Sequence, residues 1–277
     1  MKENLKTDLQ HDPSWKKKTI LFLTSQTISL FGSSLVQFAI IWYIARITDS
    51  GVMVTISTVC SFLPQVFISL YGGVWADRYN RKKLIMYADG MIAISTLILA
   101  IMMRQGYEGM WMMFLVSAIR SLGAGVQSPA VNAMIPQIVP EDKLMRVSGI
   151  NGSIQSLVNL VSPAVGGGLL ASGAFYNVLF IDVITAAIGI SILMAISVPL
   201  HNKAAAASNT DVFTDLKEGL NYAYHNVFIR RFLIMYIVFC ILFVPAAFLN
   251  VLMVTRVFGD SYWYLTMNEI IFFVGAL

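Results

Sequence analysis

Four ionisable side chains lie inside long apolar stretches of the sequence: Asp89, Arg120, Asp182 and Glu269. An ionised group at the centre of a membrane helix costs about 2.5–3.5 kcal/mol on insertion scales. Each residue therefore needs either an ion pair with another helix or a role in moving charge. The ion pair is the more ordinary interpretation for Asp89 and Asp182, which stand near the ends of their stretches. The candidates for charge-carrying roles are Glu269, Arg120 and Asp182, and a buried carboxylate can take up and release a proton.

Uncharged polar side chains recur every three or four residues in three of the apolar stretches. The first stretch has Gln26, Ser29, Ser33 and Gln37, the second Thr58, Ser61, Gln65 and Ser69, and the fifth Asn151, Gln155, Asn159 and Ser162. This spacing places each set on one face of a helix. Small polar residues also bond helices to one another, but three such faces favour a shared wet cavity. The candidates for its wall are Gln26, Gln37, Gln65, Asn151, Gln155 and Asn159.

The elements that carry these residues are predicted to be membrane-spanning helices. Only 12% of the 277 residues are charged and the mean hydropathy is +0.71, whereas soluble domains carry about 25% charged residues. A backbone inside hydrocarbon must satisfy its own hydrogen bonds, so apolar runs of 20 residues or more are expected to be helical. The runs are 19–45, 52–76, 84–103, 110–135, 147–172, 174–200, 232–255 and a partial eighth at 263–277.

Lysine and arginine are distributed unevenly between the two sides of these runs. Of the 19 basic residues, 15 fall in segments on the side of the N-terminus, Arg120 lies within a run, and three lie on the other side: Arg46, Arg104 and Arg256. Cytoplasmic connectors are enriched in Lys and Arg, so the N-terminus is expected to be cytoplasmic. The polar first 18 residues show no cleavable signal. We therefore expect a multi-pass protein of a bacterial cytoplasmic membrane.

The order of apolar and polar stretches predicts four regions. A cytoplasmic segment (1–18) precedes a six-helix bundle (19–200), a cytoplasmic linker (201–230) and the first helices of a second bundle (231–277). Val212, Leu216 and Leu220 in the linker have the spacing of an amphipathic helix that lies on the membrane face. Because the sequence ends within its eighth apolar run, we expect it to be a fragment or a truncated reading frame.

The connector between the second and third runs, GGVWADRYNRKKL, carries a recognisable signature. It resembles the G-x-x-x-D-R-x-G-R-K motif of the major facilitator superfamily at Gly73, Asp77, Arg78, Arg81 and Lys82. Asn80 replaces the usual glycine, and because Asn tolerates positive φ the turn is expected to be kept. Gly73 would let two helices approach, and Asp77 would pair with Arg81 or with a helix N-terminus of the other half. The expected conformational latch consists of Gly73, Asp77, Arg78 and Arg81.

Two further segments resemble motifs of the same superfamily. Arg120, Gly123 and Gly125 are similar to an R-x-x-x-G-x-G segment, one residue short in register, whose arginine the family associates with proton coupling. SPAVGG in the fifth run is similar to the antiporter signature G-P-x-x-G-G, with Ser162 in place of the first glycine. The resemblance implies a kinked, closely packed helix at Pro163, Gly166 and Gly167.

Longer stretches, including AIIWYIARITDSG and IRSLGAGVQSPAVNAMIPQIVPEDKL, resemble the macrolide-efflux branch of drug:proton antiporters. The resemblance covers 15–277. It implies an all-α integral membrane protein with 3+3 inverted repeats in a six-helix bundle, the start of a second bundle, and about twelve helices in the whole protein. It also implies proton-coupled export of amphiphilic drugs by alternating access, with the proton gradient as energy source and no cofactor. Export of a siderophore or lysophospholipid on the same fold, or a truncated non-transporting fragment, are the alternatives.

Other classes of protein find no support in the sequence. We expect no enzyme, because no metal-ligand cluster, nucleophile elbow or phosphate loop is present, and His11, His201 and His225 fall in polar segments. Cys60 and Cys240 stand in apolar runs without metal-like spacing. The expected partners are the bilayer and an amphiphilic small molecule, with no nucleic acid and a monomeric state.

Overall fold

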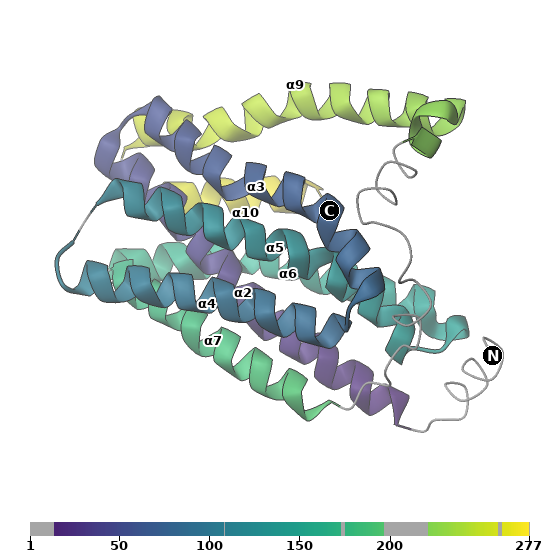
Figure 1. The fold of residues 1–277 in the computed structure, drawn as a ribbon. Helices are drawn as coiled ribbons and strands as arrows, with labels where there is room; N and C mark the ends of the chain where they lie inside the picture. The colour runs from purple at the N-terminus through teal and green to yellow at the C-terminus, as the bar shows by residue number, and fades with distance from the viewer. Residues whose placement is uncertain (1–13, 108, 173–174, 197–220, 260–261, 277) are drawn as a thin grey trace.

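The structure, a computed structural model, describes residues 14–107, 109–172, 175–196, 221–259 and 262–276 (Figure 1). Within these ranges the regular structure is helical and contains no strand. Eight long helices follow in chain order: α2 (Trp15–Thr48), α3 (Gly51–Arg78), α4 (Arg81–Arg104), α5 (Met110–Ile138), α6 (Glu141–Ser172), α7 (Phe175–Ala195), α9 (Val227–Phe258) and α10 (Tyr262–Ala276). Five of the described helices, α2, α3, α4, α6 and α7, are long and apolar enough to cross a membrane.

Polar side chains at the helix ends explain why several helices extend beyond their apolar runs. The Asn80 side chain accepts a hydrogen bond from the backbone N–H of Lys83 (3.2 Å) and so caps the start of α4. Asn226 caps α9 by accepting from the N–H groups of Phe228 and Ile229 (3.1 and 3.3 Å). The expected turn between α3 and α4 is kept, but Asn80 has a φ of −66°, so its tolerance of positive φ is not what keeps the turn. An N-cap residue keeps an extended backbone, and its side chain replaces the missing helical acceptor.

Helices α2–α7 pack in a pattern that repeats itself. The contacting pairs include α3 with α5, α2 with α7, α4 with α5, α4 with α7 and α2 with α6. When α2, α3 and α4 are exchanged with α5, α6 and α7 respectively, each of these contacting pairs becomes a pair of the same set; α3 with α5, for example, becomes α6 with α2. Two units of three helices related by a pseudo-twofold axis produce that symmetry. The predicted six-helix bundle of 3+3 inverted repeats is confirmed.

Two apolar cores lie at opposite ends of this bundle. The basic end holds the start of α2 and the turn between α3 and α4, and its core includes Phe22, Ile85 and Met134. The far end holds the connection between α2 and α3, and its core includes Trp42 and Leu179. Buried polar side chains of α2, α4, α5 and α7, among them Ser29, Asp89, Arg120 and Asp182, lie between these two cores and form a polar middle layer.

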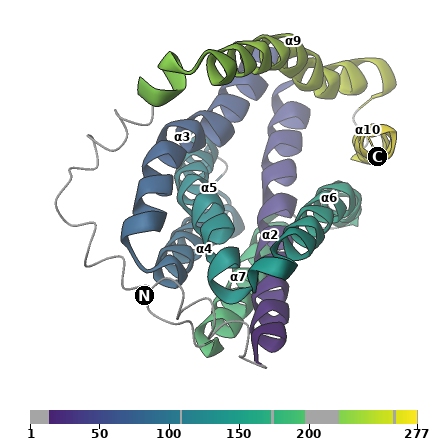
Figure 2. The ribbon, with the colours of Figure 1, turned by 90° about the vertical axis from the view of Figure 1, so that its right-hand side faces the viewer.

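Helices α9 and α10 lie outside the six-helix bundle. Figure 2 shows α10 beside α6 and α9 running across the top of the view, and α10 contacts α6 extensively. Val254 of α9 and Leu265 of α10 join the apolar core at the far end. Of the predicted linker 201–230, residues 201–220, which include most of the expected amphipathic helix, lie outside the described residues. Residues 221–225 are helical, and α9 already begins at Val227.

Candidate functional site

Helix α5 is held close to its neighbours by glycines. A Cβ built on Gly123 would meet the Ile92 side chain of α4 at 2.6 Å, and one on Gly125 would come within 2.8 Å of the Gln65 carbonyl of α3. The close approach that the sequence assigned to Gly73 belongs to Gly72, because a Cβ at position 73 meets no heavy atom within 4 Å of it in the described structure. Successive helical residues are turned by about 100°, so Gly72 faces α5 and Gly73 does not.

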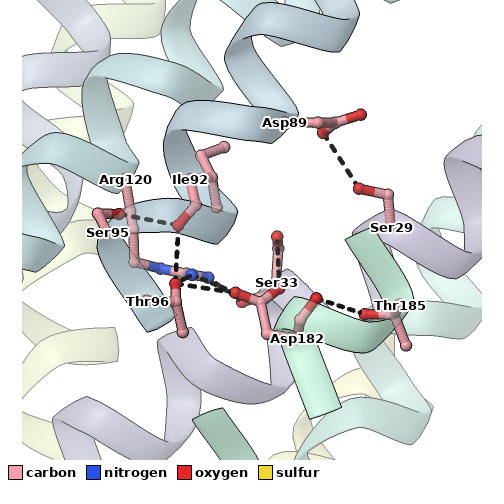
Figure 3. Close-up of polar contacts among 9 residues, drawn as sticks. All are labelled: Ser29, Ser33, Asp89, Ile92, Ser95, Thr96, Arg120, Asp182 and Thr185. Carbon is pink, nitrogen blue, oxygen red and sulfur yellow. Dashed lines mark hydrogen bonds and ion pairs between the residues drawn. The ribbon is translucent and has the colours of Figure 1, made fainter. Parts of the chain in front are cut away.

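A buried ion pair joins α5 to α7 in the middle layer (Figure 3). Arg120 Nη1 contacts Asp182 Oδ2, and the two residues are 8% and 0% exposed. The Thr96 hydroxyl lies 3.0 Å from the same carboxylate oxygen, and Ser33 Oγ donates to Asp182 Oδ1 at 3.1 Å. Arg120 Nη2 also donates to the Ser33 carbonyl (3.1 Å). Both carboxylate oxygens are therefore satisfied and the charge is balanced.

Asp89 of α4 is equally buried but differently surrounded. Its side chain is 2% exposed, and Oδ1 accepts hydrogen bonds from Ser29 Oγ (3.1 Å) and from the Gln127 amide nitrogen. Its other oxygen, Oδ2, has no hydrogen-bond partner among the described residues. No described Lys, Arg or His forms an ion pair with it, so the expected interhelical ion pair is wrong for Asp89. The α4 face at this position meets neutral serine and glutamine side chains instead.

Two polar cavities open in the same layer. The larger, about 230 Å³, is walled by α2, α3 and α5 with contributions from α4 and α6, and the smaller, about 100 Å³, lies between α2, α5 and α6. Leu30, Gln127 and Ser128 line both, so the cavities adjoin. Gln127 thus touches the cavities and also donates to Asp89. Arg120 is the only charged side chain among the described residues that line either cavity.

All six side chains predicted for a cavity wall lie in these two walls. The larger cavity is lined by Gln37, Gln65 and Asn159, and the smaller by Gln26, Asn151 and Gln155. The sequence reasoning missed the contribution of α5, which supplies Ser117, Ser121, Gln127 and Ser128. Ser117, Ser121 and Ser128 have the four- and seven-residue spacing that identified the other three stripes, whereas Gln127 is turned by about 100° from Ser128. The two prolines nearby, Pro129 and Pro136, do not interrupt α5.

The predicted latch residues interact within the six-helix bundle. Arg81 donates to the carbonyls of Ala76 at the end of α3 (2.8 Å) and Ala133 near the end of α5 (2.9 Å). Its contact with Asp77 is longer, 3.4 Å, and the Asp77 side chain is 79% exposed. Arg78 is the last residue of α3. Arg81 therefore binds chiefly to backbone carbonyls of helix ends.

Lys82, which follows Arg81 in the same motif, closes the end of a third helix. Its ammonium donates to the carbonyls of Met194 (2.9 Å) and Ile196 (2.7 Å) at the end of α7. The last carbonyls of a helix lack intrahelical partners and carry partial negative charge. The basic turn thereby joins the C-terminal ends of α3, α5 and α7.

The α6 segment with the antiporter-like motif meets α10. A Cβ on Gly167 would collide with the Thr266 hydroxyl, whereas the nearest atom to one on Gly166 is a methyl group of Leu35 at 3.5 Å. Thr266 Oγ1 lies 3.4 Å from the Pro163 carbonyl. Glu269, the third charge-carrying candidate, belongs to α10, but its side chain lies outside the described part of the chain. The structure therefore brings Arg120 and Asp182 together without placing Glu269 relative to them.

The described residues contain no group of three or more His, Cys, Asp or Glu side chains that could hold a metal ion.

A helical bundle with paired inverted repeats, apolar spans and polar cavities in its middle layer defines a polytopic membrane transporter. The profile of the Major Facilitator Superfamily matches residues 22–277, and the chain belongs to this superfamily.

Several relatives with assigned activities are efflux proteins. Macrolide efflux protein A of Streptococcus pyogenes is 28% identical over 264 residues, which are 95% of this chain and 65% of the relative. Macrolide efflux protein A of Enterococcus faecalis is 28% identical over 81% of this chain. The multidrug efflux pump Tap of Mycobacterium bovis is 26% identical over 74% of this chain and 50% of its own length. The chain thus spans 65% of the length of the streptococcal relative.

Solved structures show the same fold. The D-xylose-proton symporter superposes with a TM-score of 0.64 at 13% identity, covering 92% of this chain and 65% of that one. A bacterial homologue of the lysosomal transporter Spinster, in an inward-facing and occupied conformation, gives a TM-score of 0.53 at 16% identity over 71% of this chain and 47% of that one. The predicted major facilitator fold is confirmed.

Proposed function

We propose that the complete protein exports amphiphilic drugs of the macrolide kind in exchange for protons. The efflux relatives support this choice of substrate and direction. In this proposal the membrane is the bacterial cytoplasmic membrane and the basic end of the bundle faces the cytoplasm, because basic connectors are retained on that side.

The observation that carries the proposal is the pair of adjoining cavities with walls of neutral amides and hydroxyls. Carboxamides both donate and accept hydrogen bonds, and aliphatic side chains such as Leu30 and Ile40 lie between them. Such a wall suits a ligand that presents hydroxyls and carbonyls on an apolar skeleton. Because Arg120 is neutralised by Asp182, the described residues that line the two cavities offer no free charge that would select a small anion.

The arrangement of the two halves supports alternating access. Helices α6 and α10 are closely packed around Gly167 and Thr266, and Arg256 at the end of α9 lies 3.9 Å from Asp49 at the end of α2. Asp49 belongs to the far end, whereas Asn132 and Asn151 extend the smaller cavity towards the basic end. This geometry fits a cytoplasm-facing conformation, in which rocking of the halves would open the far end.

Proton coupling requires a group within the membrane that changes its charge during the cycle. The sequence named Glu269, Asp182 and Arg120 as candidates; because Arg120 keeps its positive charge and pairs with Asp182, Glu269 is the one of the three that fits this requirement. A transported proton would bias the equilibrium between the two conformations by its different affinity for each.

The test is accumulation of radiolabelled erythromycin in a macrolide-sensitive bacterium that expresses the full-length gene. We expect lower accumulation than in the empty host, and a protonophore should abolish the difference. Asn159→Ala in the cavity wall should weaken export, whereas Ser153→Ala on the exposed part of α6 should leave it unchanged. Equal accumulation with and without the gene would refute macrolide export, and protonophore-insensitive export would refute proton coupling.

A further inference from the structure

Asp89 is a buried ionisable group of the middle layer that forms no ion pair with any described residue. Its carboxyl is 2% exposed and receives hydrogen bonds only from neutral donors, Ser29 and Gln127, among the described residues. An unpaired ionised carboxylate in an apolar interior is far more costly than a neutral carboxyl group. The surroundings of Asp89 therefore suit a carboxyl that carries a proton for part of the cycle.

The geometry of the two oxygens agrees with this interpretation. Both donors converge on Oδ1, while Oδ2 is buried without a partner among the described residues. In Figure 3 one oxygen of Asp89 faces Ser29 and the other points away. In a protonated carboxyl the carbonyl oxygen accepts hydrogen bonds and the other oxygen carries the proton. Oδ1 therefore corresponds to the carbonyl oxygen and Oδ2 to the hydroxyl.

Asp182 has the opposite surroundings. Its two oxygens are occupied by Arg120, Thr96 and Ser33, and the guanidinium neutralises its charge. Protonation would leave the buried arginine uncompensated, at a cost of several kcal/mol. The surroundings of the Arg120–Asp182 pair therefore favour the ionised form of both residues, whereas those of Asp89 favour the neutral, protonated carboxyl.

The other charged groups around α4 leave Asp89 isolated. Asp182 on α7 and Arg120 on α5 neutralise each other beside Thr96, which lies seven residues from Asp89, roughly 10 Å along α4. Arg81 and Lys82 at the basic end of α4 are bonded to carbonyls of α3, α5 and α7. On α3, Asp77 and Arg78 lie in the last turn at the basic end, and on α2 the nearest described lysines precede Thr19.

From this arrangement we infer that Asp89 is the proton-carrying carboxyl of the six-helix bundle and that Gln127 couples its protonation to the cavity. The inference rests on the proposed proton-coupled export. An ionised Asp89 holds the Gln127 amide more strongly than a neutral one does. Loss of the proton therefore fixes the Gln127 amide on Asp89, whereas gain of the proton loosens it, so that the amide can move into the two cavities that it lines and compete with substrate. By linkage, substrate binding releases the proton, as exchange in opposite directions requires.

The first test is infrared difference spectroscopy of the full-length protein in lipid, between acidic and alkaline pH, without substrate. A protonated carboxyl in an apolar site gives a C=O stretching band, which should vanish in Asp89→Asn and persist in the matched control Asp142→Asn, an exposed carboxylate of α6. Gln127→Ala and Ser29→Ala should each shift the band to higher frequency, because each removes a hydrogen bond to the carbonyl oxygen. If Asp89→Asn does not fold, the band shifts of Gln127→Ala and Ser29→Ala still show whether the proton is on Asp89.

Three results of the infrared test would contradict the inference. A band that survives Asp89→Asn, or that neither Gln127→Ala nor Ser29→Ala shifts, would place the proton on another group and overturn the inference. The absence of any such band in the wild-type protein would overturn it as well.

The second test separates this inference from the proposed function. In inside-out vesicles of wild-type protein, a proton gradient should drive accumulation of radiolabelled erythromycin. Asp89→Asn should lose this accumulation but retain exchange of labelled for unlabelled erythromycin, which needs no net proton movement, and Asp89→Glu should recover part of it. Gradient-driven accumulation by Asp89→Asn at the wild-type level would overturn the inference alone. No accumulation by the wild type would refute macrolide–proton exchange, while the infrared test would still show whether Asp89 holds a proton.

Discussion

Gly72 of α3 lies directly against Gly125 of α5: a Cβ built at position 72 would stand 2.6 Å from the Gly125 carbonyl oxygen. The same Cβ would approach Pro129 Cγ at 3.0 Å and Val126 Cα at 3.2 Å. Because two of these three neighbours are backbone atoms, neither helix can relieve the contact by turning a side chain. The spacing of α3 and α5, and with it the larger cavity between them, depends on the missing side chain at position 72.

Alanine substitution at the two adjacent glycines should therefore give opposite results. Gly72→Ala should lower stability by about 1–3 kcal/mol through overpacking. Gly73→Ala should be neutral or raise stability by about 0.5–1 kcal/mol, because alanine is the better helix former and its Cβ meets open space. Thermal unfolding of the purified full-length protein in detergent measures both. Greater destabilisation by Gly73→Ala than by Gly72→Ala would contradict the assigned contact.

The adjacent glycines Gly72 and Gly73 also show what a sequence pattern can establish. The motif located the turn between α3 and α4 correctly, since hydropathy and basic residues are local properties of the chain. The motif could not identify which of two adjacent glycines faces α5, because that depends on the rotation of α3 against its neighbour. Similarly, the tolerance of Asn for positive φ suggested a turn residue at position 80, whereas the folded chain uses its side chain as an N-cap.

The candidate site was predictable where a helical face could be read from spacing. Six cavity residues on α2, α3 and α6 were identified in that way, and the missed Ser117, Ser121 and Ser128 of α5 obey the same rule. Pairing between helices was not predictable: the sequence indicated an ion pair as the ordinary interpretation for both Asp89 and Asp182 and named only Asp182 as a charge-carrying candidate. Only the packing of α5 against α4 and α7 brings Arg120 to Asp182 and leaves Asp89 to Ser29 and Gln127.

Replacing only one partner of the Arg120–Asp182 pair should lower the stability of the protein strongly. Asp182→Leu or Arg120→Met alone should lower stability by about 3–5 kcal/mol, because each leaves one buried charge uncompensated. The double variant should cost less than the sum of the two, as coupled neighbours do. As a control, Lys143→Ala removes an exposed pair with Asp142 (3.1 Å) and should change stability by less than about 1 kcal/mol. Additive effects of the two buried substitutions in thermal unfolding would argue against a direct pair.

The contacts of Lys82 predict a specific role for one of two neighbouring lysines. Lys82→Met should lower stability by about 1–2 kcal/mol, since it removes charge-assisted hydrogen bonds to the Met194 and Ile196 carbonyls. Lys83→Met, at an exposed position, is the matched control and should have little effect. Hydrogen exchange should become faster at the end of α7 in Lys82→Met alone. Equal rates of hydrogen exchange at the end of α7 in Lys82→Met and Lys83→Met would show that the basic turn acts only through its total charge.

Gly167 should control how closely α6 and α10 approach. Gly167→Ala places a methyl group against the Thr266 hydroxyl, and such overpacking costs about 1–3 kcal/mol in the arrangement seen here.

Cysteines introduced by Asp49→Cys and Arg256→Cys report on this arrangement, because the two positions meet where α2 and α9 end. With Cys60 and Cys240 replaced by serine, Gly167→Ala should reduce cross-linking of the introduced pair, and the added change Thr266→Ala should restore part of it by removing the hydroxyl. Gly168→Ala, whose Cβ meets open space, is the control and should leave cross-linking unchanged. Cross-linking that is equally low in Gly167→Ala and Gly168→Ala would mean that helix propensity, rather than the contact with Thr266, sets the closure of the far end.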